Sequence, residues 1–176
     1  MSEKTTASAT RRSIATALSH SKTRSAFWRD VLARRRPITS IYPFDAIERV
    51  AIVKEGVPSG LLALIAEDMA ITKDKLYDTL GLARATANRK LRDRSVLSQD
   101  ESERTLGIAR LIGQVSTIVQ ESGAPEGFDA AKWVAEWLDQ PHSALSGKRP
   151  AEFMDTADGR SLVFDLVARM QSGAYA

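Results

Sequence analysis

The stretch Thr72 to Arg94, TKDKLYDTLGLARATANRKLRDR, predicts two short helices joined by a tight turn. Thr72 is a suitable N-cap for the first helix, in which Leu76 and Leu80 lie four residues apart on one face. Gly81 can adopt the positive φ angle that ends a helix tightly, after which the chain restarts. This arrangement is typical of a helix-turn-helix.

The second of these helices is densely cationic. Between residues 81 and 94 the chain has five cationic side chains and one anionic side chain, Asp93. Its apolar anchors are Ala87 and Leu91, so that most of its surface must face water or phosphate. Composition alone favours a solvated helix face. Position favours DNA binding, because a helix-turn-helix places the early residues of its second helix against base edges and the later residues against the backbone.

Six residues of this helix form the predicted DNA-binding set. The early ones are Arg84, Thr86, Asn88 and Arg89, and the later ones are Lys90 and Arg92. Arginine can pair bidentately with guanine and asparagine with adenine, whereas the later cations, including Arg94, suit phosphates, which carry no sequence information. Ala83 stands where a capping Ser or Thr is usual, which should cost about 1 kcal/mol of helix stability.

The charge of the chain changes sign along the sequence. The 176 residues carry a formal net charge of +3, but residues 1–50 hold ten cations and four anions, whereas residues 95–176 hold seven cations and twelve anions. The basic front suits nucleic acid, and the acidic rear suits a different, basic partner. The chain has no cysteine, no signal peptide and no apolar run near 18 residues. We therefore expect a soluble cytoplasmic protein without disulfides, thiolate metal sites or membrane contact.

The N-terminal region is expected to be a basic, flexible arm over residues 1–40. Its first 25 or so residues are rich in Ser, Thr, Ala and cations, and have too few large apolar groups to offset their ordering entropy. A small apolar patch follows at Phe27, Trp28, Val31 and Leu32. An arm that enters the minor groove and a loosely docked leader both remain open.

The rest of the chain has helical periodicity without a convincing strand pattern. Residues 44–54 show apolar residues at helical spacing (Phe44, Ile47, Val50 and Ala51), and Pro58 opens the next helix. Ser98 and Glu101 form a capping box that begins a long helix. We therefore predict an all-α fold in which a helix-turn-helix domain, residues 44–97, is followed by a small helical domain, residues 98–176.

Two further helices are expected near the C-terminus. Asp129 caps the first, in which Trp133 and Trp137 lie four residues apart, a spacing that most often places both indoles in the core. Thr156 caps the last helix. Its predicted buried stripe consists of Leu162, Val163, Leu166, Val167 and Met170.

The sequence has no visible catalytic apparatus. His20 and His142 have no second ligand at metal-binding spacing, and neither a Walker loop nor a GxGxxG motif is present. The clustered carboxylates Asp100, Glu101 and Glu103 lie in the first turn of a helix, where they offset its dipole. We therefore expect a protein that is not an enzyme and has no cofactor and no metal.

The second half carries a recognisable set of residues. They are Leu97-Ser98, Glu101-Ser102, Ala135-Glu136-Trp137-Leu138, Pro141-His142, Ala144-Leu145, Gly147, Arg149-Pro150, Thr156, Gly159, Val163 and Gly173. This pattern resembles the Xre/MbcA/ParS toxin-binding domain of type II antitoxins. Upstream, Gly56-Val57-Pro58, Leu82, Thr86 and Arg89-Lys90 resemble the Xre-type helix-turn-helix that precedes this domain. The resemblance covers about residues 44–176 and leaves the first forty unexplained.

The resemblance implies an antitoxin that represses its own operon through operator DNA and neutralises a cognate toxin. In this family the toxin is commonly a RES-domain enzyme that consumes NAD, and the antitoxin covers its active-site cleft. A cleft that binds the phosphates of NAD needs cations, which an acidic domain with a short tail could mask. The residues expected to contact the toxin are Arg160, Arg169, Gln171, Ser172, Gly173, Tyr175 and Ala176. For the two arginines a solvated helix face, and for residues 172–176 a frayed terminus, remain the alternatives.

Two functional hypotheses follow. The first is an antitoxin that acts as a homodimer, because helix-turn-helix proteins usually read two half-sites at once. The second is a stand-alone helix-turn-helix regulator whose C-terminal domain only dimerises.

Overall fold

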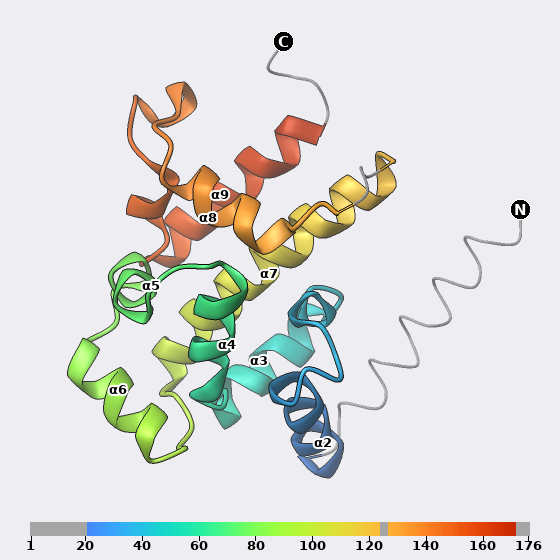
Figure 1. Ribbon diagram of the computed structural model, residues 1–176, viewed down its shortest axis with the longest axis vertical. Helices are drawn as coiled ribbons and strands as arrows, with labels where there is room; N and C mark the ends of the chain where they lie inside the picture. Colours follow the sequence, from blue (N-terminus) through green and yellow to red (C-terminus); the bar gives the residue numbers. More distant parts are fainter. Residues whose placement is uncertain (1–20, 124–126, 172–176) are drawn as a thin grey trace, which may run out of the picture.

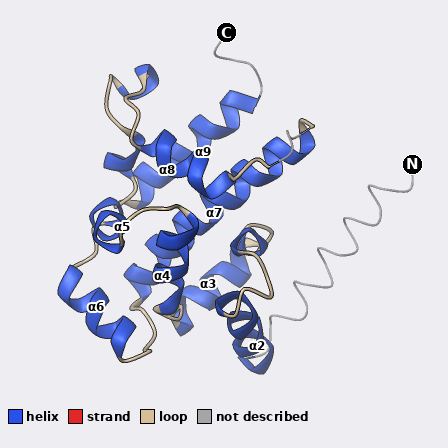
Figure 2. Cartoon of the chain, in the orientation of Figure 1, coloured by secondary structure: helices blue, strands red, loops and turns tan. Residues whose placement is uncertain are grey.

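The computed structural model describes residues 21–123 and 127–171, with the side chains from residue 24 to residue 170 (Figure 1). These residues form α-helices and short 3-10 helices and no β-strand, and the predicted all-α class is confirmed (Figure 2). The α-helices are α2 (Ser21–Leu32), α3 (Ala46–Glu55), α4 (Gly60–Asp68), α5 (Lys73–Leu80), α6 (Arg84–Arg92), α7 (Gln99–Glu121), α8 (Ala130–Leu138) and α9 (Ala157–Gln171). The 3-10 helices are η1 (Ile38–Ile41), η2 (Ser143–Leu145) and η3 (Pro150–Phe153).

The helix ends follow the local sequence. The Thr72 side chain accepts a hydrogen bond from the Lys75 N–H at the start of α5, and Gly81 ends that helix with φ of 61°. The Ser98 and Glu101 side chains form the predicted capping box of α7. Asp129 caps α8 as expected, and Ala83 precedes α6 without a side-chain cap. Local side-chain hydrogen bonding therefore sets where α5, α7 and α8 begin, but not where α6 begins.

Helix α7 runs through the middle of the molecule and contacts elements from both halves of the chain (Figure 1). It packs against η1, α3 and α4 on one side and against α8 and α9 on the other. Its residues Ile108, Leu111 and Ile112 are almost completely buried in one continuous hydrophobic cluster. The two halves of the chain therefore share a core that α7 supplies.

The structure corrects the expected arm over residues 1–40. Phe27, Trp28 and Val31 of α2 are buried, and so are Ile38 and Ile41 of η1. The Phe27 and Trp28 rings meet edge to face, with centroids 5.1 Å apart. Residues 21–41 are thus part of the folded unit, because most of their large apolar side chains reach the shared core, although Leu32 is 39% exposed. Residues 1–20 lie outside the described residues.

The buried face of α3 also differs from the expected stripe. Asp45 and Glu48 form a capping box, so that α3 begins at Ala46 and Phe44 precedes it. Ile52 of α3 is buried, whereas the Ile47 and Val50 side chains are 81% and 53% exposed. The predicted stripe on α3 is therefore wrong in its orientation, and α3 presents an apolar outer face.

The stripe on α9 is narrower than predicted. Val163, Leu166 and Val167 are buried, but Leu162 and Met170 are 43% and 39% exposed. The Thr156 hydroxyl accepts from the Gly159 N–H, at 3.1 Å, as expected for the cap of this helix.

The two tryptophans of α8 differ in burial. Their rings stack with centroids 5.7 Å apart and planes 10° apart. Trp137 is 9% exposed, whereas Trp133 is half-buried and packs at the edge of the core.

We predict that Trp137→Ala lowers the free energy of unfolding by about 3–5 kcal/mol, because removing a buried indole leaves a cavity. Trp133→Ala is the matched control and should cost less, since its ring is half-buried. Urea denaturation followed by circular dichroism measures both losses. A loss below about 1 kcal/mol for Trp137→Ala would contradict its place in the core.

Candidate nucleic-acid interface

Helices α5 and α6 form the predicted helix-turn-helix, and α6 lies at the edge of the molecule (Figure 1). Ala87 is the buried anchor of α6, and Leu82 of the preceding turn is also buried. Arg84, Asn88 and Arg92 are exposed and follow one another four residues apart, so that they share one outward face. The turn thus presents a cationic helix face to solvent.

Arg84 begins this face and is paired with two carboxylates of α5. Its Nη2 donates to Asp78 at 2.5 Å, and its Nη1 lies 3.6 Å from Asp74. The hydrogen bond that Arg84 donates to Asp78, followed by the negative charges of Asp78 and Asp74, raises the pKa of Arg84. These two carboxylates orient the guanidinium of Arg84. A base or a phosphate that contacts Arg84 would have to share the guanidinium with them.

The other early residues of α6 are placed differently from one another. Asn88 is exposed, and its side-chain oxygen accepts from the hydroxyl of the buried Tyr77 at 3.2 Å. Thr86 is half-buried, whereas Arg89 is exposed. Arg92 lies beside Asp93 at 3.6 Å, and its side chain is 74% exposed, compared with 53% for Arg84.

The position of Lys90 corrects its expected phosphate contact. Its side chain is only 16% exposed and pairs with Glu101, which is 13% exposed. Burial alone would raise the pKa of Glu101, but the hydrogen bonds from Lys90 and Ser98 outweigh it, and the pKa is lowered. Lys90 therefore ties α6 to the first turn of α7, and its ammonium group faces the protein.

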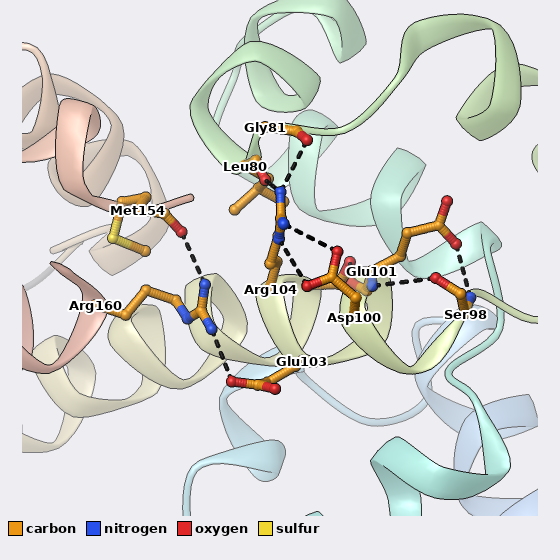
Figure 3. A network of polar contacts seen from close by, with 10 residues as sticks. Leu80, Gly81, Ser98, Asp100, Glu101, Glu103, Arg104, Met154 and Arg160 are labelled. Carbon is orange, nitrogen blue, oxygen red and sulfur yellow. Dashed lines mark hydrogen bonds and ion pairs between the residues drawn. The ribbon is translucent and has the colours of Figure 1, made fainter. Parts of the chain in front are cut away.

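A second set of contacts holds the turn between α5 and α6 (Figure 3). Arg104 of α7 donates from Nη1 to the carbonyl oxygens of Leu80 and Gly81, at 3.1 and 2.9 Å, and pairs with Asp100 at 2.9 Å. A Cβ atom at Gly81 would lie 2.8 Å from this Nη1, on a backbone with positive φ. Sequence reasoning missed Arg104. Its spacing of four residues from Asp100 predicts their ion pair, but it does not predict the contacts with the Leu80 and Gly81 carbonyl groups.

Arg160 is buried, which corrects its expected exposed position on α9. It is 7% exposed, and it donates from Nη1 to the Met154 carbonyl at 3.2 Å and from Nη2 to Glu103 at 2.8 Å (Figure 3). A Cβ atom at Gly107 would lie 2.6 Å from Arg160 Cδ, so the glycine makes room for this side chain. Arg160 joins α9 to α7 and does not face a partner.

The other expected partner contacts lie at the C-terminal end of α9. Arg169 is exposed in its last turn, and Gln171 is its last residue. The side chain of Gln171, and the residues Ser172, Gly173, Tyr175 and Ala176, lie outside the described residues.

Two family models match the chain. The antitoxin Xre-like helix-turn-helix domain matches residues 48–110, and the antitoxin Xre/MbcA/ParS C-terminal toxin-binding domain matches residues 126–173. A Prs ADP-ribosylating antitoxin from Sphingobium sp. (strain YBL2) is 37% identical over 137 residues, which cover 78% of this chain and 86% of the relative. The chain belongs to the Xre/MbcA/ParS family of antitoxins.

Membership confirms the resemblance inferred from the sequence. An Xre/MbcA/ParS antitoxin is a binding protein and not an enzyme, and it pairs a helix-turn-helix with a toxin-binding domain. The match to the helix-turn-helix model ends at residue 110, inside α7. The first half of α7 thus belongs with the helix-turn-helix, in agreement with the contacts of Glu101 with Lys90 and of Arg104 with the turn.

Within residues 21–123 and 127–171, no three His, Cys, Asp or Glu side chains come together as metal ligands. Across the same residues, none of the helices has the length and apolarity of a membrane span.

We predict that Glu101→Gln removes a pH-dependent part of the stability. Because the pKa of Glu101 is lower in the folded state than its ordinary value of 4.5, its ionised form stabilises the fold above pH 4.5, and this share is lost as the pH falls through the folded pKa. The difference in unfolding free energy between wild type and Glu101→Gln should therefore be constant near neutral pH and shrink below about pH 4.5.

Denaturant melts between about pH 3 and 7 measure this difference, and a cycle with Lys90→Met should give a coupling of about 1–3 kcal/mol. An equal difference at every pH would show that Glu101 is not held ionised by these partners.

Proposed function

We propose that this antitoxin is cytoplasmic and neutralises a RES-domain toxin that consumes NAD. It also represses its own operon by binding the promoter. The supporting observation is that one helix, α7, carries both a helix-turn-helix with an outward cationic face and the toxin-binding domain of the family. The name of the Sphingobium relative links an antitoxin with ADP-ribosylation, a reaction that takes its ADP-ribose from NAD.

The toxin contact is assigned to the C-terminal end of α9. Arg169 is exposed there, beside the partly exposed Met170, and the chain continues through Gln171, Ser172, Gly173, Tyr175 and Ala176. The exposed carboxylates Asp158 and Asp165 lie on the same helix, within a C-terminal half of the chain that has more anionic than cationic residues. An acidic surface with a short tail complements the cations that a phosphate-binding cleft requires.

The DNA contact is assigned to the exposed face of α6. Arg84, Asn88 and Arg89 read base edges with Thr86 beside them, and Arg92 contacts phosphate. Lys90 supports the helix from behind. The protein acts as a homodimer, because two copies of α6 would read two half-sites.

We predict that Arg89→Ala reduces discrimination against mutated operators by about 1–3 kcal/mol, since a bidentate contact to a base is lost. Arg92→Ala should weaken binding to all sequences alike and flatten the dependence on salt. Fluorescence anisotropy with operator and scrambled duplexes at several salt concentrations measures both effects. Wild-type specificity in Arg89→Ala would show that this face of α6 does not read the bases.

Deletion of Gln171 to Ala176 tests the toxin contact. It should weaken protection against the product of the adjacent gene, measured by growth rescue and by co-purification, while DNA binding stays unchanged. Arg92→Ala is the reciprocal control and should weaken DNA binding while protection is retained. If the deletion changes neither activity and no neighbouring gene product co-purifies, the chain is the stand-alone regulator instead.

A further inference from the structure

A pocket of about 380 Å³ lies where α3, α7 and α9 meet. It lies at the junction of the helix-turn-helix and the toxin-binding domain, and neither the proposed DNA contact nor the proposed toxin contact uses it. Its charged lining residues are Arg49, Lys54, Glu103, Arg110 and Arg160. Pockets at such junctions are common sites for small ligands.

The charges in this pocket are not balanced. Its single carboxylate, Glu103, is taken by Arg160 at 2.8 Å. Among the described residues, no carboxylate forms an ion pair with Arg49, Lys54 or Arg110. Three positive charges therefore line one cavity without a counter-ion from the protein.

Arg110 shows the imbalance most clearly. Its Nε atom is buried and has no hydrogen-bond partner within the described part of the chain, and its guanidinium stacks over the Phe164 ring at 4.8 Å. Burial, together with the positive charge of Arg49, lowers the pKa of Arg110. Arg49 donates to the Phe44 carbonyl at 2.5 Å, which fixes it in place. Arg110 as a whole is half-buried. A partly buried charge without a carboxylate partner is costly, and an anion between these groups would reduce that cost.

The number of cations indicates the class of anion. A phosphate dianion offers several oxygens and matches two arginines and a lysine better than a single carboxylate does. The remaining walls are mostly apolar, with Val50, Val53, Leu106 and Phe164, and Val50 is 53% exposed at the rim. We propose that this pocket binds the phosphate group of a small phosphorylated ligand, with Arg49, Lys54 and Arg110 around the phosphate and the apolar walls around the rest.

Thermal unfolding of the full chain tests this site at constant ionic strength, with chloride as the reference anion. Sodium phosphate, adenosine 5′-monophosphate and adenosine are the probes. A phosphate-bearing probe at about ten times its Kd should raise Tm by about 3–6 °C, whereas adenosine should not. A larger effect of the nucleotide than of phosphate would identify an organic phosphate as the ligand, and an equal effect would identify free phosphate. No shift with either phosphate-bearing probe overturns the proposal.

Variants locate the binding. Arg110→Met keeps an unbranched side chain over Phe164 but removes the charge, and should abolish the shift without lowering the Tm of the free protein. Arg35→Met, which removes one charge from a side chain that is 72% exposed, is the matched control and should keep the shift. Val50→Glu places a carboxylate at the rim without changing the core, and it should also reduce the shift. It serves as the test variant if Arg110→Met does not fold. A shift that survives both pocket variants, or that Arg35→Met abolishes, overturns the assignment.

Discussion

The ion pair between Lys90 and Glu101 is the contact on which the helix-turn-helix depends. Helix α6 has Ala87 as its only fully buried side chain among its described residues, and Ala83 gives it no side-chain cap. An alanine buries too little area to fix the orientation of a helix. Polar contacts therefore have to hold α6. The Arg84–Asp78 and Tyr77–Asn88 bonds join it to α5, and the Lys90–Glu101 pair in its last turn and the Arg104 contacts at the turn before it join this unit to α7.

Because α7 holds both halves, the positions of the two binding surfaces are linked. In its first turns, Glu101 pairs with Lys90 of α6 and Arg104 binds the carbonyl oxygens of the turn between α5 and α6. Glu103 pairs with Arg160 of α9. Its later turns pack against α8 and α9 through buried apolar residues. A helix of 23 residues is a rod of about 34 Å. A substitution that moves one end of α7 would therefore disturb the cationic face and the α9 surface together.

Features that depend on neighbouring residues could be predicted from the sequence, and features that depend on distant partners could not. The caps at Thr72, Ser98 and Asp129 and the turn at Gly81 each involve groups within a few residues, and all four are confirmed. Lys90 and Arg160 look like exposed cations in the sequence because their carboxylates lie 11 and 57 residues away. The outward face of α3 was missed for a similar reason. Apolar spacing indicates a stripe, but the neighbouring helices decide which stripe is buried.

A partner of opposite charge, more than burial itself, separates the structural arginines from those open to a ligand. Arg160 and Arg110 line the same pocket from facing helices, but only Arg160 has a carboxylate. Replacing a buried ion pair by apolar residues is often neutral for stability, whereas an unpaired buried charge is a net cost. Arg160 can therefore be explained by the fold, since it links α9 to α7. The fold alone gives no such reason for the guanidinium of Arg110, whose contact with Phe164 a methionine could also make.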